Sequence, residues 1–131
     1  MSVTVIYRED GGVVLDAEGI VTGEQLFECN RTIYATDEKS AKLKYQICDF
    51  TKAVKFEIST SELRGIASQD QKAAALNPNM PIVIVGAEDL FYGLARMWEV
   101  YVSEAPFETA VFRELEEAEA WLESELQKRP S

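Results

Sequence analysis

The chain has 131 residues, 47% hydrophobic and 27% charged, which is typical of one folded domain over residues 1–131 and excludes a disordered segment. Its thirteen basic and twenty-three acidic side chains give a net charge of −10. This balance argues against nucleic acid or an anionic membrane surface as partner, because both attract clustered Lys and Arg.

No signal peptide is visible, and the longest apolar run, Ile82–Val85, is far shorter than the roughly 20 residues of a membrane span. We therefore expect a cytoplasmic protein with no stable membrane insertion.

The first half of the sequence predicts a β-hairpin, a helix and a third strand. Val3–Tyr7 alternates with period two, and Asp10-Gly11-Gly12 is a tight-turn signal before a second strand at Val13. Thr22 and Gln25 form a capping box that opens a helix running to about Thr36. The next strand is expected from Leu43 to Phe50.

The second half alternates helices and strands. Ser59 and Glu62 form another capping box, which predicts a helix over Thr60–Leu76. The elements that follow are a strand over Pro81–Gly86, a helix over Glu88–Val102, a strand over Phe107–Phe112 and a helix over Glu114–Lys128. The order ββαβαβαβα predicts an α/β fold with a single mixed sheet of about five strands and four helices, in which Ile82–Val85 is central.

The sequence holds no recognisable catalytic machinery. It has no histidine, which removes the commonest general base and the commonest metal ligand, and no glycine-rich phosphate loop occurs. We expect no enzyme, no cofactor and no metal site. An enzyme would need Asp49, Ser61 and Arg96 to converge in the fold. Cys29 and Cys48 have no metal-ligand spacing and are interpreted as reduced core thiols.

One candidate site is the hydroxyl cluster Ser59, Thr60 and Ser61 at the start of a helix. Exposed N–H groups and the positive end of the helix dipole favour an anion or a phosphorylated side chain there. The alternative is that Ser59 is only an N-cap and that its two neighbours only face water.

A second candidate site is the helix Glu88–Val102, which is apolar over about 160°, whereas roughly 100° is enough to seat a helix on a sheet. The apolar surface that the sheet does not cover would face a neighbouring loop, a partner chain or a ligand. The alternative is that all of it is buried in a closed internal core. The segment Thr51–Ile58, expected to be a loop, could cover it. The candidate apolar or interface residues are Phe56, Ile58, Phe91, Leu94, Met97, Trp98 and Tyr101.

A resemblance to a known family begins with Ile47-Cys48-Asp49-Phe50 and the hydroxyl cluster that follows. The C-terminal half carries most of it, through Pro81–Gly86, Tyr92–Glu99, Pro106-Phe107-Glu108 and Val111–Leu122. With the element order, they resemble the STAS domain, and most closely its SpoIIAA-like (STAS/SEC14-type) branch in uncharacterised bacterial proteins. In anti-anti-sigma members a helix opens with Asp-Ser-Ser-Gly-Leu-Gly, in which a serine is phosphorylated. Thr60, Ser61 and Leu63 match that motif.

Three positions depart from the motif: Ser59 replaces the aspartate, and Glu62 and Arg64 replace the glycines. Glu62 adds a negative charge and a Cβ where the family leaves open backbone, which argues against a kinase switch. We therefore expect a non-enzymatic STAS-like interaction or regulatory module acting through helix surfaces. The surplus apolar surface of the helix Glu88–Val102 predicts self-association, most simply as a homodimer. The alternative is a carrier or sensor of a small apolar, lipid-like ligand between the Glu88–Val102 helix and the Thr51–Ile58 loop.

Overall fold

The structure is a computed structural model that describes residues 3–87, 89–105 and 108–129. Within these residues the chain forms five strands and five helices. The strands are β1 (Val3–Tyr7), β2 (Val13–Thr22), β3 (Gln46–Glu57), β4 (Pro81–Val85) and β5 (Glu108–Phe112). The helices are α1 (Gly23–Ile33), α2 (Asp37–Lys42), α3 (Thr60–Leu76), α4 (Asp89–Tyr101) and α5 (Leu115–Gln127).

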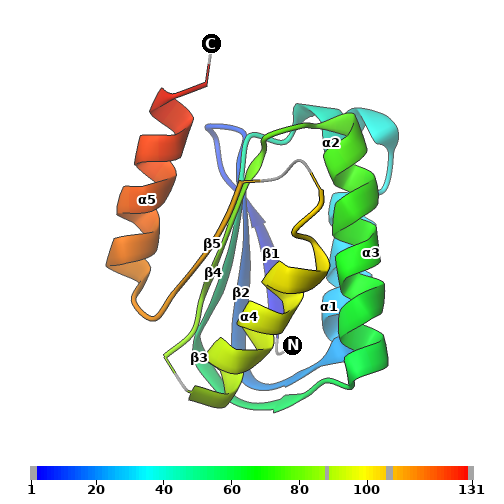
Figure 1. The fold of residues 1–131 in the computed structure, drawn as a ribbon, viewed down its shortest axis with the longest axis vertical. Coiled ribbons are helices and arrows are strands. Elements are labelled where there is room, and N and C mark those ends of the chain that lie inside the picture. Colours follow the sequence, from blue (N-terminus) through cyan, green and yellow to red (C-terminus); the bar gives the residue numbers. More distant parts are fainter. Residues whose placement is uncertain (1–2, 88, 106–107, 130–131) are drawn as a thin grey trace.

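The five strands form one mixed sheet in the order β1-β2-β3-β4-β5. β1 and β2 make the predicted antiparallel hairpin, and the remaining neighbours are parallel. Helices α1, α3 and α4 lie on one face of the sheet, and α5 lies alone on the other (Figure 1). This arrangement confirms the predicted α/β class with a single mixed sheet.

Each face of the sheet carries its own hydrophobic core, because side chains alternate along a strand. In β4, Ile82 and Ile84 belong to the larger core under α1, α3 and α4, whereas Val83 and Val85 belong to the smaller core under α5. β4 is therefore buried on both faces, as the apolar run predicted. It is an interior strand, but β3 occupies the middle of the sheet.

The predicted starts of α1 and α3 are correct, since both capping boxes form. Glu88 and Phe107, the predicted first residues of a helix and a strand, lie outside the described residues. The Thr22 side chain accepts from the Gln25 backbone N–H, and the Ser59 side chain accepts from that of Glu62. The helix predicted to reach Thr36 instead ends at Ile33, and the short helix α2 follows with Thr36 as its N-cap. The helix count is therefore five rather than four.

The expectation of a loop over residues 51–58 is wrong, because β3 continues to Glu57. The reason is β2, which is ten residues long and offers a pairing edge over its whole length. Its second half pairs with β3 through Glu18 with Lys52 and Val21 with Phe56, across two register shifts. This segment is part of the sheet, and the ring of its Phe56 packs against that of Phe91 on α4.

Candidate functional site

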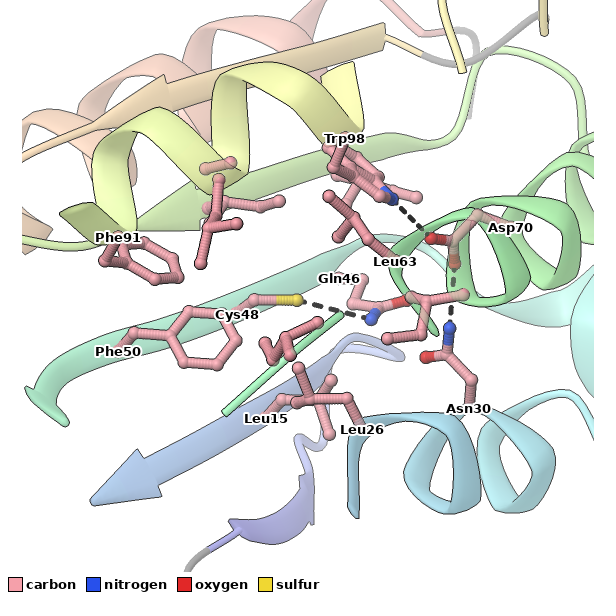
Figure 2. Close-up of a pocket in the computed structure, with 16 residues that line it drawn as sticks. Leu15, Leu26, Asn30, Gln46, Cys48, Phe50, Leu63, Asp70, Phe91 and Trp98 are labelled. Carbon is pink, nitrogen blue, oxygen red and sulfur yellow. Dashed lines mark hydrogen bonds between the residues drawn. The ribbon is translucent and has the colours of Figure 1, made fainter. Parts of the chain in front are cut away.

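A small cavity lies in the larger core, between the sheet and helices α1, α3 and α4 (Figure 2). Its volume is about 60 Å³. The wall is mostly hydrocarbon from β2, β3, β4 and the three helices. The lining residues are Leu15, Leu26, Asn30, Gln46, Cys48, Phe50, Ile58, Leu63, Ile66, Asp70, Ile82, Ile84, Phe91, Leu94, Ala95 and Trp98.

One end of the cavity is built around the buried carboxylate of Asp70, on α3. Its Oδ1 accepts from the Asn30 side-chain amide at 3.2 Å and from the Tyr34 hydroxyl at 2.8 Å. Its Oδ2 accepts from the Trp98 indole N–H at 2.8 Å (Figure 2). The donors come from α1, from the C-cap of α1 and from α4. Asp70 therefore ties the three helices on this face together.

The polar chain continues from Tyr34 to β3. The Tyr34 hydroxyl lies 2.9 Å from Gln46 Oε1, and the Gln46 amide donates to the sulfur of Cys48 at 3.4 Å. Gln46 and Cys48 alternate with Ile47, so their side chains lie on the face that carries the cavity. Each polar lining residue is thus hydrogen-bonded within the site.

Burial sets the protonation of these groups. It raises the pKa of Asp70 to about 6, although the hydrogen bonds from Trp98, Tyr34 and Asn30 lower that pKa by stabilising the charged form. Burial, and after it the nearby Asp70 charge, raises the pKa of the Cys48 thiol to about 12. Cys48 is therefore a neutral thiol at physiological pH and a poor nucleophile.

The other end of the cavity is lined by the aromatic rings of Phe50 and Phe91, and Phe56 packs against both. The ring centroid of Phe91 lies 4.5 Å from that of Phe50 and 4.6 Å from that of Phe56. Gly86, just after β4, permits this packing, because a Cβ there would overlap the Phe91 ring. The first turn of α4 is thereby seated directly on the backbone at the end of β4.

The structure brings some of the predicted apolar residues together and separates others. Ile58, Phe91, Leu94 and Trp98 line the cavity, and Phe56 packs behind Phe91. Met97 is 39% exposed and points away from the core. Tyr101 is half-buried, with the Arg64 guanidinium 5.2 Å from its ring centroid.

The hydroxyl cluster lies at the exposed N-terminus of α3. There the Glu62 carboxylate accepts the Ser59 backbone N–H at 2.8 Å, and the Ser59 hydroxyl accepts the Glu62 backbone N–H at 3.0 Å. A carboxylate of the chain itself therefore already occupies part of the predicted anion seat. Binding at Ser59, Thr60 and Ser61 stays a prediction.

Asp49, Ser61 and Arg96 do not form one constellation. Asp49 shares the α5 face of β3 with Ile47, whereas Ser61 and Arg96 belong to helices on the other face. The Asp49 carboxylate accepts from the Thr51 backbone and hydroxyl at 3.0 and 2.7 Å. Arg96 forms an ion pair with Glu99 at 3.5 Å.

Sequence reasoning missed the polar end of the site, although the helical pattern held a signal. Asp70 falls on the buried stripe of α3 with Leu63, Ile66 and Ala74, and Asn30 falls on the buried stripe of α1. A charged residue on an apolar stripe predicts a buried partner, because an unpaired charge is costly to bury. Gln46 shows no such signal, since only the parallel pairing of β3 places it inside.

One mixed sheet with α1, α3 and α4 on one face and α5 on the other (Figure 1) is the arrangement of a SpoIIAA-like fold, related to that of STAS domains. The crystal structure of an uncharacterised DUF3478-family protein with a SpoIIAA-like fold, from Shewanella loihica PV-4, superimposes with a TM-score of 0.56. The two sequences are 18% identical, and the match covers 92% of this chain and 91% of the other.

No protein-family model and no curated protein matches the sequence. Among the residues that the structure describes, no helix is long and apolar enough to cross a membrane.

Proposed function

We propose that this chain is a non-enzymatic binding module whose cavity under α4 takes up a small apolar molecule. The observation that carries the proposal is the state of the polar lining: Asn30, Gln46, Cys48, Asp70 and Trp98 hydrogen-bond within the site. A water molecule in such a space needs two to four polar partners, and an apolar cavity without them stays dry. An apolar occupant would instead gain dispersion contacts with a hydrocarbon wall.

The size of the cavity limits the occupant. Its 60 Å³ are less than half of the about 150 Å³ of an engineered apolar cavity in another protein that holds benzene or xenon. The lipid-like ligand considered from the sequence exceeds this space. A compact ligand of a few heavy atoms fits the geometry better.

The test uses xenon as the probe and two matched alanines. Ala95 lines the cavity from α4, whereas Ala118 is equally buried under α5 in the other core. We expect dissolved xenon to shift the NMR signals of Ala95 and of the Trp98 indole N–H. Ala95→Leu should fill the cavity and abolish the shift of the Trp98 indole N–H with little loss of stability. Ala118→Leu should cost about 1–3 kcal/mol by overpacking and keep them.

Absence of these shifts in the parent protein would overturn the proposal. Shifts that persist unchanged in Ala95→Leu would do the same, because the probe would then bind elsewhere.

The second candidate is a homodimeric interaction module, favoured by the outer side of α4. Met97 and Val100 are 39% and 69% exposed there, on neighbouring turns. Exposed apolar side chains on one helix suit a two-fold contact between copies. Sedimentation at high micromolar concentration should then show a dimer that Val100→Glu dissociates, and a monomer at every concentration would exclude this candidate.

A further inference from the structure

We propose that the cavity under α4 selects uncharged molecules and rejects anions such as small carboxylates. This inference rests on the proposed function and names the class of its ligand. Asp70 is the one charged residue among the described residues that line the cavity, and it is 3% exposed. Three hydrogen bonds, from Asn30, Tyr34 and Trp98, stabilise its carboxylate in this buried position.

An anion in the cavity would meet repulsion that nothing in the wall offsets. At an effective dielectric constant of about 20, two like charges about 6 Å apart repel by an energy that lowers affinity about 100-fold. The anion would also lose its hydration against hydrocarbon. The lining supplies only neutral donors: Asn30 and Trp98 already bind Asp70, and the Gln46 amide donates to Cys48.

The charges around the cavity also favour an uncharged ligand. Ile58, a half-buried lining residue, leads directly into the N-terminus of α3, where the Glu62 carboxylate closes the capping box. A carboxylate-bearing ligand would thus meet a negative charge in the cavity, from Asp70, and another beside Ile58, from Glu62. Arg64, on the next turn, is held over the Tyr101 ring and does not belong to the lining.

A cation is also a poor occupant. An ammonium group would be attracted to Asp70 by the same energy that repels an anion. It would also lose its hydration against hydrocarbon, and that loss exceeds what one carboxylate, already bound by three donors, returns. The remaining ligand class is small, uncharged and mostly hydrocarbon.

The experiment compares three probes with one carbon skeleton: cyclopropylmethanol, cyclopropanecarboxylate and cyclopropylmethylammonium. Binding is followed at pH 8 by the NMR shift of the Trp98 indole N–H, with xenon as the positive control. We expect the alcohol to bind at least 10-fold more tightly than either ion. In Asp70→Asn the alcohol-to-carboxylate ratio should fall at least 10-fold, whereas Asp16→Asn, on the other face of the sheet, should leave it unchanged.

The outcomes separate the two proposals. If xenon fails to bind, the proposed function fails. If xenon binds but the carboxylate binds as tightly as the alcohol, only the inference about charge is overturned. If xenon binds but none of the three probes does, the inference about charge is overturned too. The cavity would then exclude all three probes, whatever their charge. The comparison in the parent protein decides the matter even if Asp70→Asn does not fold.

Discussion

Replacing Trp98 by phenylalanine should destabilise the protein more at pH 8 than at pH 5. The indole N–H donates to Asp70 Oδ2 at 2.8 Å in a buried site. Because burial raises the pKa of Asp70 to about 6, this carboxyl is mostly ionised at pH 8 and mostly protonated at pH 5. A hydrogen bond to an ionised group contributes about 1.5–3 kcal/mol, and one between neutral groups about 0.5–1.5 kcal/mol.

The free energy lost should therefore be about 1–1.5 kcal/mol larger at pH 8. The volume removed with the indole is the same at both pH values, so the difference between them isolates the hydrogen bond. Urea unfolding at each pH measures it. In addition, the pKa of Asp70, followed by carbon-13 NMR, should rise by about one unit in the variant, since one unit corresponds to 1.36 kcal/mol.

Trp121→Phe is the matched control. Trp121 is half-buried on α5, where its ring centroid lies 6.4 Å from that of Phe112 in the other core. Its replacement should lower stability equally at the two pH values and leave the titration of Asp70 unchanged. Equal losses at pH 5 and pH 8 for Trp98→Phe, with an unshifted Asp70, would refute the assignment of this bond.

Three further predictions concern the charge, the backbone and the caps. Folding raises the pKa of Asp70 from 3.8 to about 6, so its contribution favours the folded state below pH 4 and is lost as pH rises through 6. Relative to Asp70→Asn, the parent should lose about 2.5 kcal/mol of unfolding free energy between pH 4 and pH 8; parallel profiles would contradict this. Gly86→Ala should lower the free energy of unfolding by about 1–3 kcal/mol, because the new Cβ displaces the Phe91 ring, and an unchanged Tm would exclude that contact. Ser59→Ala should cost about 1 kcal/mol in urea unfolding through loss of the capping box, whereas a similar loss in the neighbouring Thr60→Ala would show that capping is not the cause.

Local patterns in the sequence determined most of the fold. The turn after Tyr7 required a hairpin, and the two capping boxes fixed the starts of α1 and α3. The apolar run of β4 required an interior strand, since five consecutive buried residues need cover on both faces. These features depend on residues within one or two turns of each other, which is why they can be read from the order of amino acids.

The tertiary structure alone decided the extent of β3 and the nature of the site. Residues 51–57 became a strand because β2 offered a partner far away in the sequence. Trp98 looked like surplus apolar surface, yet it is a hydrogen-bond donor, because α3 places Asp70 opposite it. The sequence determined which stripe of each helix is buried, but only the packing of α1, α3 and α4 on one sheet decided which polar groups meet there, since their pairing joins residues up to 40 positions apart.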